Sequence, residues 1–319
     1  MGVALVEVGQ LGALFETVKG TANAPAALDA GIRVWDIGLE EKVEMHERNP
    51  VEAEFDQPHA IPGMRSYQLT FRAEIVGGTS AGSRPPVWQL LQACSLTEAI
   101  SAGVSVTYSP LTPEASQKTV TIDVYRRVAG AVKRHRLTGA MGNVRIVCLS
   151  DGVPYMEFTF LGVYNEPVDV ADLLTTPPYV MAGPPPVVGA TVSLMSQTLR
   201  CVGFEIDLGN KVELREDVNQ PSGYVHAVVV DRLPTISVAP EDELAATVEW
   251  LAKKTTPTVG EFIGLIGSAA GNIFRVRAPA AQVMEAGWGT RGTRITRTLS
   301  LAARKLANAG ADSLTIRWT

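Results

Sequence analysis

Cysteine is scarce in this chain. Its 319 residues include three cysteines, Cys94, Cys148 and Cys201, which lie far apart and form no C-x-x-C pair. An odd number of widely spaced cysteines argues against a disulfide scaffold and against a cysteine-ligated zinc site. We therefore expect buried free thiols in a protein that works in a reducing compartment.

Aromatic residues, a basic excess and long apolar runs are also lacking. Aromatic residues make up 6% of the chain, and the net charge is −5. Without a basic excess the chain lacks the positive charge that is typical of proteins that bind DNA tightly. No uncharged apolar run reaches the length of about 18 residues that a membrane span needs, so we expect no membrane contact. The opening segment carries Glu7 and Glu16 and no basic region, so no signal peptide is predicted.

Short alternating segments typical of β-strands are what the chain has in abundance. In residues 65–76, Tyr67, Leu69 and Phe71 alternate with polar residues. This period of two predicts a strand with one buried face and one solvated face. Similar β-branched or aromatic runs, bounded by Gly, Pro or Asp, predict further strands. They lie at residues 103–111, 118–127, 132–142, 143–149 and 154–164.

Two other segments divide the chain. Residues 85–96 begin with proline and place Trp88 and Leu91 at helical spacing, which predicts a short helix. Residues 165–190 are rich in proline and predict an extended linker. We place a domain boundary within that linker, near Gly183. The predicted domains are residues 1–182, with an N-terminal arm and the linker, and residues 183–319, which form a shorter domain.

The second half of the sequence repeats landmarks of the first in the same order. "KVEMHERN" at residues 42–49 resembles "KVELREDV" at 211–218, and "VWQLLQAC" at 87–94 resembles "TVEWLAKK" at 247–254. "GAMGNVRI" at 139–146 resembles "SAAGNIFR" at 268–275. The shared order predicts an internal duplication. The fold class expected is mainly β, with two pseudo-repeated sandwich or barrel-like domains, each with a flanking α-helix.

Residues that carry chemistry are few. None of His46, His59, His135 and His226 is followed by a possible metal ligand at i+2, i+3 or i+4, and no H-E-x-x-H motif occurs. The "GTSAG" at residues 78–82 has the length of a nucleophile elbow but follows an amphipathic strand in a soft loop. We therefore predict no enzyme activity, no catalytic residue, no cofactor and no metal.

The segment "LTGAMGNVRI" at residues 137–146 raises one further possibility, a phosphate-binding loop. It lacks the Lys-Ser/Thr of a Walker A motif and precedes a β-prone run rather than a helix. Gly and Asn tolerate positive φ, which tight hairpins require. We therefore predict a turn at Gly142 and Asn143, and an equivalent turn at Gly271 and Asn272.

The basic segment "RRVAGAVKRHR" at residues 126–136 is the one prominent charge cluster. It predicts a hairpin that gathers Arg126, Arg127, Lys133, Arg134 and Arg136 in one region. A solvated hairpin is one interpretation. Another is a set of intersubunit contacts with an acidic stretch of a neighbouring subunit, such as residues 6–16 or 39–47. Nucleic-acid binding ranks third, because stacking aromatic residues are not interleaved with the charges.

Four stretches, at residues 66–96, 103–111, 135–146 and 155–169, together resemble the tail tube proteins, or major tail proteins, of long-tailed bacteriophages (siphophages). The resemblance is clearest over residues 65–170 and concerns the branch with a duplicated tube domain. It implies β-sandwich or barrel-like domains whose sheets join side by side into a ring. It also implies trimeric rings of pseudo-sixfold symmetry that stack into a tube, through which DNA leaves the virion.

The resemblance further implies the partners and the location of the protein. The partners would be other copies of the chain, the tape-measure, tail-terminator and distal-tail proteins, and DNA in transient passage. The chain would be made in the bacterial cytoplasm and end in the virion tail. Two alternatives are a β-sandwich module that binds carbohydrate or acts as a hydrolase, and the tube protein of a related contractile or secretion system.

Overall fold

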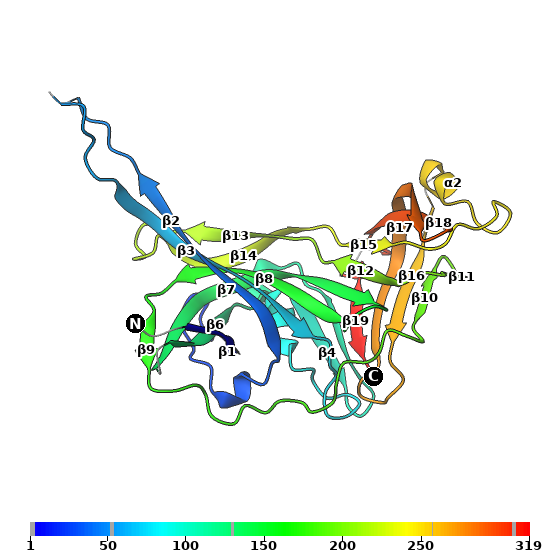
Figure 1. Ribbon diagram of the computed structural model, residues 1–319, viewed down its shortest axis with the longest axis horizontal. Coiled ribbons are helices and arrows are strands. Elements are labelled where there is room, and N and C mark those ends of the chain that lie inside the picture. Colours follow the sequence, from blue (N-terminus) through cyan, green and yellow to red (C-terminus); the bar gives the residue numbers. More distant parts are fainter. Residues whose placement is uncertain (1–3, 52–53, 129–130, 257, 308–310) are drawn as a thin grey trace.

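A computed structural model describes residues 4–51, 54–128, 131–256, 258–307 and 311–319 (Figure 1). The fold is mainly β, with 52% strand and 6% helix, and most strands belong to one large antiparallel sheet. This confirms the predicted β class. Within the described residues there is no helix long and apolar enough to cross a membrane.

The elements of residues 1–182 surround one six-residue helix, α1 (Trp88–Ala93). The strands are β1 (Ala4–Phe15), β2 (Val34–His46), β3 (Ile61–Glu74), β4 (Leu96–Ser101), β5 (Ser105–Pro110), β6 (Val120–Val128), β7 (Ala131–Leu149), β8 (Tyr155–Tyr164) and β9 (Val168–Val170). Antiparallel pairing joins them in the order β2-β3-β8-β7-β6-β1. In addition, β9 pairs with the start of β7, and β4 pairs with β5.

Residues 183–319 contain a second six-residue helix, α2 (Trp250–Thr255), which lies against β17. The strands are β10 (Thr191–Leu194), β11 (Gln197–Thr198), β12 (Gly203–Asp207), β13 (Asn210–Glu216), β14 (Tyr224–Arg232), β15 (Thr235–Val238), β16 (Val259–Ile266), β17 (Phe274–Arg291), β18 (Arg294–Ala303) and β19 (Thr315–Trp318). Their pairing order is β12-β15-β18-β17-β16-β10. Here β19 pairs with the start of β17, while β13 and β14 form a separate two-stranded sheet.

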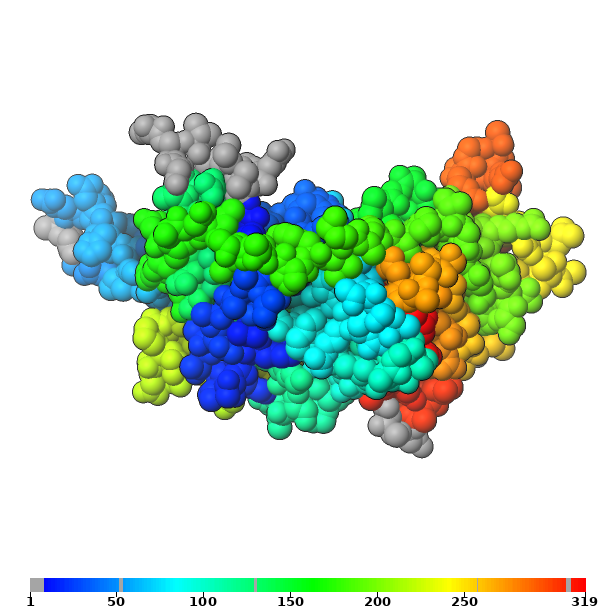
Figure 2. Space-filling model, turned by 90° about the horizontal axis from the view of Figure 1, so that it is seen from below, coloured from blue at the N-terminus to red at the C-terminus, as the bar shows by residue number. Residues whose placement is uncertain are grey.

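The two halves are joined edge to edge. The end of β7 pairs with β12, and β19 pairs with β5. One hydrophobic core runs through both halves and includes Phe71 and Phe158 of the first and Phe204 and Phe274 of the second. The linker at residues 165–190 crosses the face seen in Figure 2 as a green band. It is held by two hydrogen bonds between the Gln10 side chain and the Leu174 backbone.

Local patterns explain why these segments form these elements. In β3, Tyr67, Leu69, Phe71 and Ala73 are buried and the residues between them are partly exposed, as the alternation predicts. The predicted helix is present as α1, where Leu91 is fully buried. A helix of six residues is too short to be stable alone, so α1 is stabilised by packing against the sheet rather than by its own helix propensity.

The predicted turn at Gly142 and Asn143 is wrong. Both residues lie inside β7, which runs without a break through the two strands predicted at residues 132–142 and 143–149. The positive φ is instead at Gly139, where β7 bulges between Thr138 and Met141. A bulge accommodates the extra residue without reversing the chain, and a glycine supplies the unusual backbone angle. The second turn is confirmed, because Gly271 has φ +86° in the β16–β17 connection.

Candidate assembly surfaces

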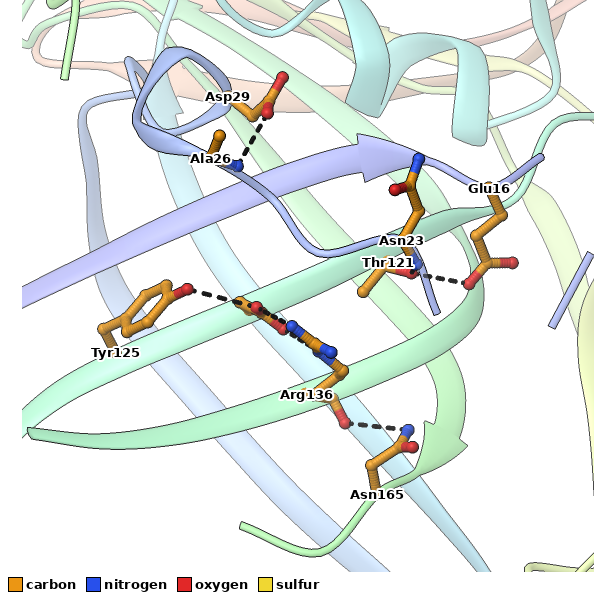
Figure 3. Close-up of polar contacts among 9 residues, drawn as sticks. Glu16, Asn23, Ala26, Asp29, Thr121, Tyr125, Arg136 and Asn165 are labelled. Carbon is orange, nitrogen blue, oxygen red and sulfur yellow. Dashed lines mark hydrogen bonds and ion pairs between the residues drawn. The ribbon is translucent and has the colours of Figure 1, made fainter. Parts of the chain in front are cut away.

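The basic cluster lies on the β6–β7 hairpin, as predicted, but part of its charge is used within the chain. Arg136 donates two hydrogen bonds of 2.7 Å to the carboxylate of Asp123, which is fully buried (Figure 3). These hydrogen bonds raise the pKa of the Arg136 guanidinium above its ordinary value. Bidentate pairing of this kind fixes geometry as well as charge. The Arg136 guanidinium is therefore paired with a buried carboxylate of its own chain.

The other four residues of the cluster divide into two groups. Arg126 donates to the backbone oxygen of Ile37 at 3.1 Å, and Arg127 forms an ion pair of 2.7 Å with Asp172. Lys133 and Arg134 form no ion pair with any residue that the structure describes. Lys133 is exposed, whereas the Nε atom of Arg134 is buried and has no hydrogen-bond partner. Intersubunit contact by the cluster stays a prediction, and Lys133 is the member best placed to make it.

The strand edges without a partner in the described part of the chain include those of β2 and of the end of β17. β2 pairs with β3 on one side only. The end of β17, beyond its pairing with β16 at Gln282, pairs with β18 alone. An open strand edge presents unpaired N–H and C=O groups and is a template for pairing with another chain. A strand of another chain could therefore add to the sheet at these edges.

The outer end of the β2–β3 hairpin projects from the body of the molecule (Figure 1). We call residues 42–46 of β2 and 61–65 of β3 the arm. Val43, Met45 and Ile61 on it are 37%, 54% and 50% exposed. At the base of the arm, the Arg65 backbone donates to the Ser222 backbone oxygen at 2.9 Å. Exposed apolar side chains on a projecting hairpin are typical of an interaction surface. The only sequence signal for the arm is its "KVEMHE" alternation.

The β13–β14 hairpin, in contrast, is folded onto the body. Val212 and Leu214 of β13 pack with Ala227 and Val229 of β14 against Met141 of β7, in a small cluster separate from the main core. β14 lies against β7, β8 and β3. A hairpin of two strands is marginally stable in isolation, so this packing is what holds β13–β14 in place.

The two asparagines of the repeated Gly-Asn motif join the halves. Asn143 donates from Nδ2 to Asp207 at 2.7 Å and accepts from the backbone N–H of Asn210 at 2.9 Å. Asn272 accepts from the backbone N–H of Gly77 at 2.8 Å. Sequence reasoning assigned these residues to turns and missed that role. Nothing local distinguishes an asparagine that bonds across the fold from one that caps a turn.

A shallow cationic pocket of about 480 Å³ lies where β16, β17, β19 and β5 meet. Arg275 of β17 is directly opposite Arg317 of β19, and the Nε atoms of both are buried without a hydrogen-bond partner. Arg277 beside them forms an ion pair with Glu261. Like charges placed opposite each other on neighbouring strands are destabilising. The pocket therefore favours an anionic group between its arginines.

Arrangements suited to catalysis are not found among the described residues. No cluster of three or more His, Cys, Asp or Glu side chains is placed to hold a metal ion there. Cys94 and Cys148 are buried free thiols, as predicted, and burial raises the pKa of each far above its ordinary value. A thiol that stays protonated is a poor nucleophile.

No protein-family model matches the chain, and no curated protein sequence matches it.

Proposed function

We propose that the chain is a virion structural protein that forms the tail tube of a long-tailed bacteriophage. Three copies form a ring of pseudo-sixfold symmetry, and rings stack into a channel for DNA ejection. The protein is not an enzyme and needs no cofactor. Its partners are copies of itself and the tape-measure, tail-terminator and distal-tail proteins. It is made in the bacterial cytoplasm and functions in the virion tail.

The observation that carries the proposal is the repeated strand order. The order β2-β3-β8-β7-β6-β1 of the first half matches β12-β15-β18-β17-β16-β10 of the second, strand for strand. In each half a six-residue helix lies in the chain between the second strand of this order and the long hairpin: α1 follows β3, and α2 follows β15. Likewise β9 and β19 each pair with the start of the long strand. This agreement supports two tube domains that arose by duplication.

The repeated strand order aligns the two halves differently from the sequence match between the two Gly-Asn segments. By strand order, the β16–β17 turn with Gly271 corresponds to the β6–β7 turn, not to Gly142 inside β7. The "KVEMHE" and "KVELRE" segments do correspond, because the first lies at the outer end of β2 and the second lies on β13, which directly follows β12, the counterpart of β2. The excess length of the first half falls between α1 and β6, where β4 and β5 are inserted. The division at residue 183 into two tube domains is part of this proposal.

The junction between the halves supports ring formation. Within one chain, the end of β7 pairs with β12 and the sheet continues from one half to the other. The strand that corresponds to the end of β7 is the end of β17, and the strand that corresponds to β12 is β2. Both of these have an open edge in the described residues. Pairing of β17 with β2 of the next chain would repeat the internal junction and, in a closed ring, cover both of these edges.

Electron microscopy of the purified protein tests the proposal. We expect rings or tubes with a central channel and threefold symmetry when the protein is concentrated. A protein that stays monomeric at every concentration, and that binds a glycan or hydrolyses a substrate, would contradict the proposal and favour the carbohydrate-binding or hydrolase alternative. Sixfold rings of single-domain size would instead favour a contractile or secretion tube.

A further inference from the structure

The two halves carry corresponding hairpins with different surroundings. In the second half, β12 leads into β13 and β14 leads into β15, with a bend at Gly209, which has φ +64°. In the first half, β2 and β3 follow the same course with no such break. The arm is therefore the counterpart of the β13–β14 hairpin. Its "KVEMHE" at residues 42–47 aligns with "KVELRE" at 211–216.

The β13–β14 hairpin covers the outer face of the first half. Its Val212 and Leu214 pack near Met141, as described above. Gln117 forms two hydrogen bonds with the backbone of Val229, of 3.0 and 3.1 Å. The backbones approach closely at Gly139, where a Cβ atom would lie 2.7 Å from the Cα atom of His226. This hairpin therefore shows how such a hairpin binds the outer face of a tube half.

The arm has apolar side chains at the corresponding positions, but within the described residues no surface like that of β7 covers them. Val43 and Met45 take the places of Val212 and Leu214, yet they are 37% and 54% exposed. Exposed apolar side chains on an extended hairpin stabilise neither the hairpin nor the fold. A surface that fits them must come from outside this chain if the correspondence between the halves holds.

We propose that the arm of one subunit docks on the outer face of the β17–β18 hairpin of a second copy of this chain, as β13–β14 docks on β7–β8 within one chain. The proposal rests on the proposed ring, because it uses the same symmetry of halves. It adds an intersubunit contact that the strand edges alone do not supply.

The outer face of β17–β18 has the features that the arm requires. Met284 lies at the β17 bulge, between Val283 and Glu285, and is 40% exposed. The β7 bulge next to Met141 is the corresponding feature. A Cβ atom on Gly287 would meet only Thr298, at 3.8 Å, so this part of the strand has space for a close neighbour.

Charge also favours this contact. At the β17–β18 turn, Arg291 and Arg294 share the single carboxylate of Glu241, at 2.5 and 2.6 Å, so the turn has a surplus of positive charge. The loop that joins the two strands of the arm presents the exposed carboxylates of Glu47, Glu54 and Asp56 against one exposed cation, Arg48. Opposite charges across an interface speed association and fix its register.

Charge substitution in the arm tests the contact. We expect Met45→Glu to raise the concentration needed for ring assembly at least tenfold, because a carboxylate would be buried against Met284. The melting temperature of the unassembled chain should not change, because Met45 is exposed there. Met181→Glu, the same substitution at a linker residue that is 85% exposed, is the control and should assemble like the wild type. Unchanged assembly of the Met45→Glu variant would overturn the docking contact.

Cross-linking locates the partner surface. We expect Met45→Cys and Met284→Cys, combined in a Cys201→Ser background, to give covalent oligomers with a short bis-maleimide reagent. A link within one chain is not expected, because the arm and β17 lie at opposite ends of the molecule (Figure 1). Rings without a cross-link would overturn the docking contact and leave the tube proposal standing. A wild-type chain that never forms rings, with no cross-link in the variant, would overturn both.

Discussion

At the scale of single residues, the Asp123–Arg136 pair is the most deeply buried ion pair described in the first half. The Asp123 side chain is completely buried and the Arg136 side chain is 16% exposed. Tyr125 adds a 3.3 Å hydrogen bond to the same carboxylate. A buried pair contributes little net stability as a whole, but removing one partner leaves a charge without compensation.

We expect Asp123→Ala to lower the free energy of unfolding by about 3–5 kcal/mol. Urea denaturation followed by circular dichroism measures the change. Asp172→Ala is the matched control, because its pair with Arg127 is exposed and should contribute less than about 1 kcal/mol. Equal effects of the two variants would show that burial of the ion pair does not determine how much stability is lost.

Two histidines predict how stability depends on pH. Burial lowers the pKa of His226 and of His135 below their ordinary values, and nearby Lys19 and Arg215 add to the effect at His226. The unfolded chain then binds protons more readily than the folded chain, so stability falls as the pH drops below about 6.5. Carboxylates with lowered pKa values, such as Glu241, act in a separate window at lower pH.

We therefore expect His226→Leu to reduce the loss of stability between pH 7 and pH 5.5. Urea midpoints measured across this range test the expectation. His59→Leu, at an exposed position, should leave the pH profile as it is in the wild type. A profile that stays equally steep in the His226→Leu variant would contradict it.

At the scale of elements, Asn143 connects strands that belong to different halves. Its side chain bonds to Asp207 at the end of β12 and to the backbone of Asn210 at the start of β13. Asn210 in turn donates to the backbone oxygens of Cys94 and Gly142. The network fixes where β13 leaves the main sheet and therefore how the β13–β14 hairpin meets β7.

We expect Asn143→Ala to lower the free energy of unfolding by about 1–3 kcal/mol, because partly buried polar groups lose their partner. Chemical denaturation measures this value. Asn219→Ala, in the exposed loop between β13 and β14, should change it by less than about 0.5 kcal/mol. A neutral Asn143→Ala variant would show that the junction does not depend on this side chain.

Sequence patterns predicted some of these elements well and others poorly. The alternation of residues 65–76 and the spacing of Trp88 and Leu91 predicted β3 and α1, because local periodicity reports which face is buried. The length of β7 was missed, since Gly139 and Gly142 are typical of turns and only the tertiary pairing with β6, β8 and β12 keeps this segment extended. The basic cluster was correctly placed on a hairpin, because that placement follows from the local sequence pattern. The burial of Asp123 was not predicted, because it depends on tertiary packing.

At the scale of the whole molecule, the halves share one sheet and one core. β12 completes the edge of β7, and β19 completes the edge of β5. The Trp318 side chain of β19 is buried against Tyr108 of β5, with ring centroids 5.9 Å apart. Two halves whose edges and cores are joined in this way need not be independent folding units.

We expect a single cooperative transition on heating, with equal calorimetric and van't Hoff enthalpies, if the chain is kept unassembled. Residues 1–182 expressed alone should be insoluble or unfolded, because they would expose the edges of β5 and β7. Two separate transitions in differential scanning calorimetry, or a stably folded fragment 1–182, would contradict this expectation.

The pairing of β5 with β19 has a consequence for the order of folding. β5 is synthesised early, whereas Thr315–Trp318 of β19 follows nearly the whole of the second half. Closing a contact between such distant segments is entropically costly, and topologies of this kind fold slowly. One edge of β5, the one opposite β4, therefore stays without its partner strand until synthesis has passed β19. In the proposed assembly, only a chain that has been made through β19 can offer a finished sheet to its neighbours.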